Sequence, residues 1–358
     1  MNVHVPSRWA LPPLTIGEFA QDFKAPTRAN AKYNFNSVAG RYVLLGFVPE
    51  GSEAAARAAY DTIRRRFDDH NFCAFLVTPR GDFADTPPDA IPGLRWFLDP
   101  EGAVRAKFGP EPGWILLDPA LRVMDLAPID APQAMFARIA RLPPPSEHAG
   151  TSLVAPVLIA PRVFEPELCQ RLIACYEAEG GKFTGVMREI DGRTVGVLDP
   201  MKRRRDVTVE DRELRAVVIN RLERSLLPMI ERAYHFRATR IERYLVARYA
   251  ADEGGYFRPH RDNTTPGTAH RRFAVSINLN SEAFEGGDLR FPEFGQRTYR
   301  PPTGGAVVFC CSLLHEATPV TRGHRYAFLP FLFDEAGEEV RNRNLHNVDL
   351  SRATDHSR

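Results

Sequence analysis

The octapeptide YFRPHRDN, residues 256–263, places a histidine and an aspartate two positions apart, His260 and Asp262. On an extended segment, side chains two positions apart point the same way, so an imidazole nitrogen and a carboxylate oxygen can meet at one point. A metal ion needs that geometry. An isolated His-x-Asp triplet more often lies on a solvated turn, so a third ligand is required before the pattern indicates metal chemistry.

His315 is the histidine best placed to supply the third ligand. It follows the apolar run GGAVVFCC, residues 304–311, where a strand of a small β-fold would return to the mouth of its barrel. Two histidines and one carboxylate form the facial triad that holds Fe(II) and leaves positions open for a cosubstrate and oxygen. We therefore predict that His260, Asp262 and His315 bind iron.

An arginine stands ten positions after His315. Arg325 lies in the largely apolar run HRYAFLPFLF, residues 324–333. A guanidinium among apolar residues needs an anion, and its planar N–H groups suit bidentate binding of a carboxylate. The alternative is a surface-facing arginine on an edge strand. With the three metal ligands in place, we predict that Arg325 binds the distal carboxylate of 2-oxoglutarate.

These motifs resemble a known family. Residues 152 to about 335 are similar to the Fe(II)- and 2-oxoglutarate-dependent dioxygenases, specifically the prolyl 4-hydroxylase-like branch. The resemblance rests on five ordered elements: Tyr249, the His-x-Asp pair, Gly286 and Gly287 before DLRFP, Gly305 before AVVF, and His315 followed by Arg325. It implies a double-stranded β-helix (jelly roll) with iron inside, and a Tyr249 hydroxyl that donates to the C5 carboxylate beside Arg325. Prolyl 4-hydroxylases usually have Lys at that last position.

The resemblance also implies the reaction and its cofactors. It implies oxidative decarboxylation of 2-oxoglutarate to succinate and CO2, coupled to hydroxylation of an unactivated C–H bond. Fe(II), 2-oxoglutarate and O2 are the expected cofactors, with ascorbate as a candidate reductant. The Asp262 carboxylate favours hydroxylation, because related halogenases have a small residue at that place. The substrate stays open among free amino acids, peptide or protein side chains and small metabolites.

Two basic runs and three asparagines are candidates for substrate contacts. The runs KRRRD, residues 202–206, and HRR, residues 270–272, could hold an acidic substrate, although such clusters are more often solvated faces. Asn263, Asn278 and Asn280 could line the site as hydrogen-bonding groups.

The chain divides at a proline-rich segment. RLPPPSEHAG, residues 141–150, excludes helix and ladder pairing, so we place a linker at 143–152 between domains at 1–142 and 153–358. The second domain is predicted to begin with helices at 165–181 and 208–227, the latter opened by Thr208 with Asp211 three residues on. Many short β-rich runs follow, which favour a sandwich or a jelly roll.

The residue pattern of the first domain predicts an α/β fold. Short apolar runs at 40–49, 72–79, 94–102 and 114–128 alternate with a helical segment at 53–70. This order resembles the thioredoxin-like fold of peroxiredoxins. Ala54, Ala55 and Ala56 stand where the resemblance would place the peroxidatic cysteine, so we expect a redox-inactive module, because the thiolate is the nucleophile. An unrelated small α/β domain is the alternative.

Composition limits the partners. The 358 residues carry a net charge of +2 with 26% charged and 44% hydrophobic residues, which gives no bias towards nucleic acid or membrane. The amino terminus lacks a signal-peptide pattern, and we expect a cytoplasmic protein. The five cysteines form no CxxC pair, so no disulfide framework is expected. Alternative functions are a redox protein and a non-catalytic module that binds a metabolite or docks a partner; the oligomeric state is open.

Overall fold

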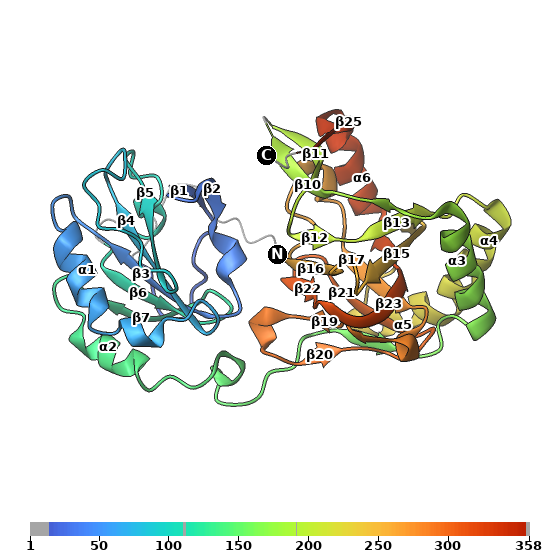
Figure 1. The fold of residues 1–358 in the computed structure, drawn as a ribbon, viewed down its shortest axis with the longest axis horizontal. Helices are drawn as coiled ribbons and strands as arrows, with labels where there is room; N and C mark the ends of the chain where they lie inside the picture. Colours follow the sequence, from blue (N-terminus) through green and yellow to red (C-terminus); the bar gives the residue numbers. More distant parts are fainter. Residues whose placement is uncertain (1–13, 110–111, 191, 356–358) are drawn as a thin grey trace, which may run out of the picture. The chain divides into compact units, whose positions relative to one another are not determined.

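A computed structural model describes residues 14–109, 112–190 and 192–355, and the chain forms two compact units (Figure 1). The first comprises Met1–Val154 with Pro292–Gln296, and the second comprises Ala155–Phe291 with Arg297–Arg358. The proline-rich segment predicted as a linker contains a single 3-10 turn, Pro145–Glu147.

The first unit contains a five-stranded sheet in the order β5-β4-β3-β6-β7. Strands β3, β4 and β5 are mutually parallel, whereas β6 and β7 are antiparallel to their neighbours. The elements of this unit are β1 (Lys24–Thr27), β2 (Asn30–Asn34), β3 (Tyr42–Phe47), α1 (Glu53–Asp61), β4 (Phe72–Thr78), β5 (Leu94–Leu98), β6 (Trp114–Leu117), β7 (Val123–Ala127) and α2 (Gln133–Ile139), joined in places by short 3-10 turns.

Burial on both faces explains the continuous apolar strands of this sheet. Every residue of β3 and β4 is buried, as expected for strands covered on two sides. Helices α1 and α2 pack in one cluster with Trp96 and Trp114, and stacked Phe75 and Phe97 mark the opposite face. Helix α1 ends at Asp61, earlier than the predicted segment 53–70, and a 3-10 turn over Arg64–Arg66 follows it.

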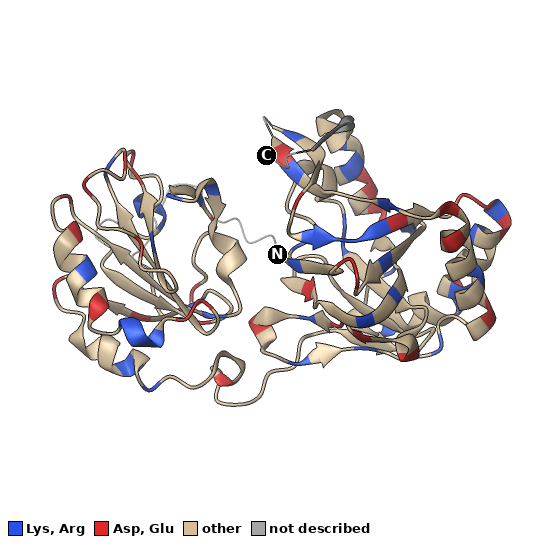
Figure 2. Ribbon diagram, in the orientation of Figure 1, with Lys and Arg blue, Asp and Glu red and all other residues tan. Residues whose placement is uncertain are grey.

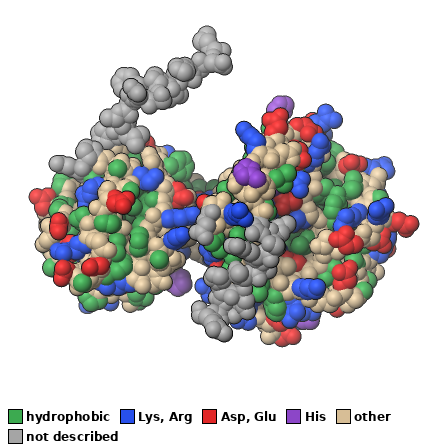
Figure 3. Space-filling model, turned by 90° about the horizontal axis from the view of Figure 1, so that it is seen from above, with side chains coloured by type: hydrophobic (Ala, Val, Ile, Leu, Met, Phe, Trp, Pro, Cys, Tyr) green, Lys and Arg blue, Asp and Glu red, His purple; other side chains and the backbone are tan. Residues whose placement is uncertain are grey.

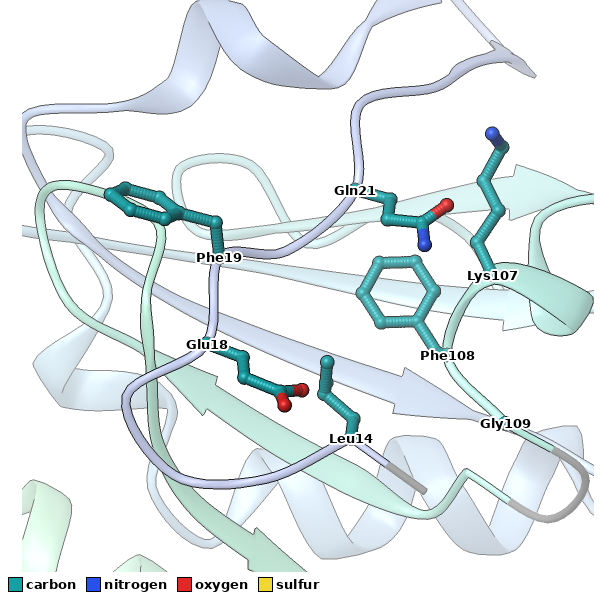
Figure 4. Close-up of a pocket in the computed structure, with 7 residues that line it drawn as sticks. All are labelled: Leu14, Glu18, Phe19, Gln21, Lys107, Phe108 and Gly109. Carbon is teal, nitrogen blue, oxygen red and sulfur yellow. The ribbon is translucent and has the colours of Figure 1, made fainter. Parts of the chain in front are cut away.

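The first unit also has a shallow pocket of about 310 Å³ (Figure 4). Its lining offers one carboxylate and one ammonium group but neither cysteine nor histidine: Leu14, Glu18, Phe19, Gln21, Lys107, Phe108 and Gly109. This lining supplies no group suited to redox chemistry.

The second unit is built from three sheets. The large sheet runs β14-β24-β17-β23-β15-β13-β9, with β21 and β8 continuing from β17 and with β18 paired to β23. The small sheet runs β12-β16-β22-β19-β20, and the third runs β10-β11-β25. The strands are β8 (Leu158–Ala160), β9 (Lys182–Phe183), β10 (Val186–Ile190), β11 (Arg193–Leu198), β12 (Lys202–Arg203), β13 (Arg205–Thr208), β14 (Arg240–Glu242), β15 (Leu245–Ala250), β16 (Tyr256–His260), β17 (Phe273–Asn278), β18 (Phe284–Gly286), β19 (Leu289–Arg290), β20 (Thr298–Tyr299), β21 (Ala306–Cys310), β22 (His315–Ala317), β23 (Val320–Phe328), β24 (Phe331–Phe333) and β25 (Val348–Asp355).

Alternation along the strands gives the large sheet two different faces. On β15, Val246 belongs to the core shared with α3 (Pro166–Glu179), α4 (Arg212–Arg221) and α5 (Leu227–Tyr234). Leu245, Ala247 and Tyr249 point the other way and pack with Ala317 of the small sheet. The helices therefore cover the outer face, and the inner face is turned towards the small sheet (Figure 1).

Charge is mixed on the face of the molecule in Figure 3, where acidic and basic side chains are interspersed among apolar ones. In the described ranges, no helix combines the length and apolar character that a membrane span requires. All five cysteines are free, in agreement with the expected lack of a disulfide framework.

The cap of α4 differs from the prediction. Thr208 ends β13 instead of opening the helix, and α4 begins after Asp211. The Asp211 carboxylate accepts hydrogen bonds from the backbone N–H groups of Glu213 (2.8 Å) and Leu214 (3.0 Å). The β-ladder between β13 and β15 includes Thr208, which is why the helix cannot start there.

We expect Asp211→Ala to lower the stability of the second unit by about 1 kcal/mol, because two backbone donors lose their acceptor. The measurement is the midpoint of urea unfolding, followed by circular dichroism. Thr208→Ala is the matched control and should shift the midpoint less. An equal or larger shift for Thr208→Ala would contradict this assignment of the cap.

Candidate active site

Antiparallel pairing brings the two predicted histidines together. His260 is the last residue of β16, His315 is the first residue of β22, and the two are cross-strand partners. Asp262 follows β16, and its backbone N–H donates to the carbonyl of Cys311 at 3.0 Å. The structure therefore brings together the three side chains that the sequence selects.

The ligand atoms of these three side chains lie within 4.8 Å of one another. His260 Nε2 is 3.6 Å from Asp262 Oδ1, and His315 Nε2 is 3.3 Å from Asp262 Oδ2. The Nδ1 atoms are hydrogen-bonded to backbone carbonyls, that of His260 to Arg258 at 2.8 Å and that of His315 to Leu313 at 3.0 Å. These bonds leave both Nε2 atoms facing the carboxylate.

Aromatic rings enclose the histidines. The ring of Phe257 stacks on His260 at 3.5 Å, and the ring of Phe309 lies 4.5 Å from His315. Burial, helped by the neighbouring His315, lowers the pKa of His260 to about 4, so its imidazole is neutral at pH 7. Burial alone would raise the pKa of Asp262, but His315 and His260 outweigh it and hold that pKa well below its ordinary value.

This donor set fits Fe(II). Two neutral imidazoles and one carboxylate are the facial set that non-haem iron prefers. Backbone acceptors on both Nδ1 atoms are the outer partners that usually orient metal-binding histidines. We find no other cluster of three such donors among the described residues.

Arg325 is buried on the inner face of the large sheet. Its side chain is 3% exposed and donates to the Gly287 carbonyl (2.8 Å), to Ser276 Oγ (2.8 Å) and to Asn278 Oδ1 (3.3 Å). Within the described part of the chain, no carboxylate forms an ion pair with it. Burial lowers its pKa, so a bound anion would stabilise the charge.

Tyr249 lies opposite Arg325 in the register of β15 and β23. The guanidinium of Arg325 packs over the Tyr249 ring, with its carbon 5.3 Å from the ring centre. The Tyr249 hydroxyl accepts a hydrogen bond from Arg204 Nη1 at 3.3 Å. Its proton therefore remains available for a second acceptor.

The Gly-Gly pair explains how Arg325 is seated. Gly287 has φ +67°, and a Cβ atom there would lie 2.7 Å from Val320 Cγ2 and 3.3 Å from Arg325 Cδ. Its carbonyl accepts from the guanidinium. Only glycine permits this close approach at a positive φ.

The basic runs are not solvated faces. Lys202 and Arg204 from the first run are buried, as are His270 and Arg271 from the second. Figure 2 shows the basic colour of β12 within the second unit. Each of these guanidinium groups has an acidic partner: Arg204 binds Asp206, and Arg271 binds Glu242.

The three candidate asparagines have different contacts. Asn278 contacts Arg325, whereas Asn263 donates to Ser312 Oγ and Asn280 donates to the His324 carbonyl. Sequence reasoning missed Ser276. Ser276 lies two residues before Asn278 on β17, so strand alternation places both on the inner face.

Part of the second unit is similar to known proteins. A family model described as the 2OG-Fe(II) oxygenase superfamily matches residues 244–333. A PKHD-type hydroxylase of Paracoccus denitrificans is 32% identical over 178 residues, which are 45% of this chain and 74% of that protein. A PKHD-type hydroxylase of Cupriavidus metallidurans is 31% identical over 129 residues, 33% of this chain and 56% of that protein. A solved prolyl-4-hydroxylase of Pseudomonas putida shares 18% identity over 51% of this chain and 94% of that one, with a TM-score of 0.39.

The chain belongs to the 2OG-Fe(II) oxygenase superfamily. It is an enzyme of the hydroxylase type, as predicted from the sequence, and the family implies Fe(II), 2-oxoglutarate and O2.

We expect His260→Ala and His315→Ala each to weaken metal binding more than about 100-fold, because loss of an outer-shell partner alone costs about 10–100-fold. Mn(II) binding, followed by electron paramagnetic resonance of the free ion, measures the effect. His324→Ala removes an exposed histidine and should bind Mn(II) as the wild type does. Unchanged binding by a folded His260 or His315 variant would remove that residue from the site.

Proposed function

We propose that this enzyme hydroxylates an unactivated C–H bond of a small-molecule or peptidyl substrate, and that His260, Asp262 and His315 hold its iron. The observation that carries the proposal is the compact donor set, with ligand atoms within 4.8 Å and both Nδ1 atoms tied to the backbone. The buried Arg325, which lacks an acidic partner in the described chain, supports a cosubstrate with a distal carboxylate.

Bound Fe(II), together with 2-oxoglutarate and O2, would supply the oxidising chemistry that releases succinate and CO2 as the substrate is hydroxylated. Arg325 would bind the C5 carboxylate through its fork, and Tyr249 would donate its free proton to the same group. Phe257 and Phe309 keep water away from the histidine rings. Ascorbate is proposed only as a reductant that keeps the iron ferrous.

The finer assignment of the fold is also a proposal. Two facing sheets, with the ligands on one and the anchor on the other, support a double-stranded β-helix for residues 153–358. Parallel β3, β4 and β5 with antiparallel β6 and β7, and helices that share one core cluster, support a thioredoxin-like domain for residues 1–142. We assign that domain a scaffolding or substrate-docking role, and a cytoplasmic location to the protein.

The first test is anaerobic addition of Fe(II) and 2-oxoglutarate to the purified protein. The proposal predicts a weak metal-to-ligand absorption band in the visible region, because both ligands would bind one centre. A colourless mixture at saturating concentrations would oppose the proposed site.

We expect Arg325→Ala to weaken 2-oxoglutarate binding by about 10–100-fold, the effect of losing a charge-assisted bidentate contact. Arg325→Lys should recover part of the loss, and Tyr249→Phe should lose less, about 1 kcal/mol for one neutral hydrogen bond. Calorimetric titration into anaerobic Mn(II)-loaded protein measures these effects. Arg322→Ala, on the same strand but 71% exposed in its side chain, is the matched control.

The first domain should not reduce peroxide. Ala54 to Ala56 lie in the first turn of α1, and the one cysteine of residues 1–154, Cys73, is buried on β4. Burial raises the pKa of the Cys73 thiol to about 12, which leaves it protonated. We expect the protein to consume hydrogen peroxide no faster than its Cys73→Ser variant, in a coupled assay with a thiol reductant. A rate that depended on Cys73 would restore the redox alternative.

A further inference from the structure

Among the described residues of the second unit, we consider four arginines with buried guanidinium atoms near the two facing sheets, and three of them are accounted for. Arg204 is paired with Asp206, with Nε to Oδ1 at 2.6 Å. Arg271 is paired with Glu242, with Nε to Oε2 at 2.8 Å and Nη2 to Oε1 at 2.5 Å. Arg325 is reserved for the cosubstrate carboxylate in the proposed function. The fourth is Arg243, between β14 and β15.

Arg243 has neither a hydrogen-bond partner nor an ion-pair partner among the residues that the structure describes. Its Nε atom is buried and unsatisfied. Its guanidinium carbon lies 4.2 Å from the ring centre of Phe331, which is its one close ring contact. A cation–π contact leaves the in-plane N–H donors of the guanidinium free, and burial of the Nε donor without an acceptor is costly.

Strand alternation and contacts place this guanidinium near the metal site. Leu332 on β24 belongs to the helix-covered core, so its neighbour Phe331 faces the interior. The Phe331 ring also carries the guanidinium of Arg271 at 4.0 Å. Arg271 in turn donates from Nη1 to the backbone carbonyl of Asp262 at 3.3 Å.

Electrostatics agree with this position. The pKa of Arg243 is lowered to about 10, first by burial and then by the charges of Arg271 and Arg204, while Glu242 and Asp262 oppose the change. The charge of Arg243 thus interacts with that of Arg204, which donates to Tyr249, and with that of Asp262, the candidate metal ligand.

Charge balance then identifies what is missing. Asp206 neutralises Arg204, and Glu242 neutralises Arg271. In the proposed function, the two carboxylates of 2-oxoglutarate and that of Asp262 balance Fe(II) and Arg325. Lys202 shares Asp206 with Arg204, and burial holds the pKa of Lys202 well below its ordinary value. The positive charge of Arg243 is left without an acidic partner among the described residues.

We propose that Arg243 binds an anionic group, a carboxylate or a phosphate, of the substrate that is hydroxylated. This inference rests on the proposed function and narrows it, because neutral metabolites and uncharged peptide segments would leave the charge unbalanced. The Phe331 ring lies against the face of the Arg243 guanidinium. The N–H groups in the guanidinium plane are therefore left to donate to the anionic group of the substrate.

The test uses the full chain loaded with Mn(II) and saturating 2-oxoglutarate, which occupies Arg325. Inorganic phosphate and acetate are titrated separately by calorimetry, and the tighter of the two identifies the class of anion. Phosphorus NMR of the same phosphate samples reports proximity, because paramagnetic Mn(II) broadens the resonance of phosphate bound near it. We expect one bound anion per chain and a broadened phosphate resonance.

Arg243→Gln should weaken binding of the tighter anion at least about tenfold, as expected for loss of a charge-assisted contact, and remove the broadening. Arg243→Lys should keep part of both, whereas a purely structural role would make Lys and Gln alike. Arg240→Gln, an exposed arginine three residues away that pairs with Glu335, is the matched control and should behave as the wild type.

Two results would overturn the inference: wild-type affinity for both anions in a folded Arg243→Gln variant, or a wild-type chain that binds neither acetate nor phosphate. Failure of the wild type to bind 2-oxoglutarate in the same samples would instead refute the proposed function, so the two failures are told apart.

Discussion

The antiparallel register of β16 and β22 is the constraint on which the site depends. It sets His260 opposite His315, and a slip of one residue would turn one imidazole to the other side of the sheet. The register of β15 and β23 has the same role for Tyr249 and Arg325 on the facing sheet. Backbone pairing therefore assembles both halves of the site, and the side chains need only short rotations to meet a ligand.

Residues with distinctive chemistry could be predicted from the sequence, and residues defined by burial could not. His260 and Asp262 are two positions apart, so both lie on one side of an extended segment, while the residue types of His315 and Arg325 beside apolar runs mark them as candidates. The strands of the first unit are similarly foreseeable from their apolar runs, but their order in the sheet is not. The fold of that unit depends on which strands pair and how the helices pack, and the residue types alone do not determine either.

In the KRRRD run, the basic composition and the alternation of residues along a strand lead to different predictions of burial. Lys202, Arg204 and Asp206 are two positions apart, so on an extended chain they share a side, and all three are buried. Arg203 between them is exposed. Counting basic residues predicts a solvated face, whereas counting every second residue predicts a buried ion pair. The α4 cap shows the same competition, since Thr208 suits a cap but is already used by the β-ladder.

The separation of the two sheets has a consequence for cosubstrate choice. In the proposed function, one end of the dicarboxylate binds a metal held by the small sheet and the other end binds Arg325 on the large sheet. Packing of Leu245, Ala247 and Tyr249 against Ala317 fixes the gap between these sheets. In that function, the spacing of the two sheets would set the length of dicarboxylate that reaches from the metal to Arg325. Apolar side chains such as Leu245 and Ala247, which are not assigned any contact with the carboxylates, would thus contribute to selectivity among such acids.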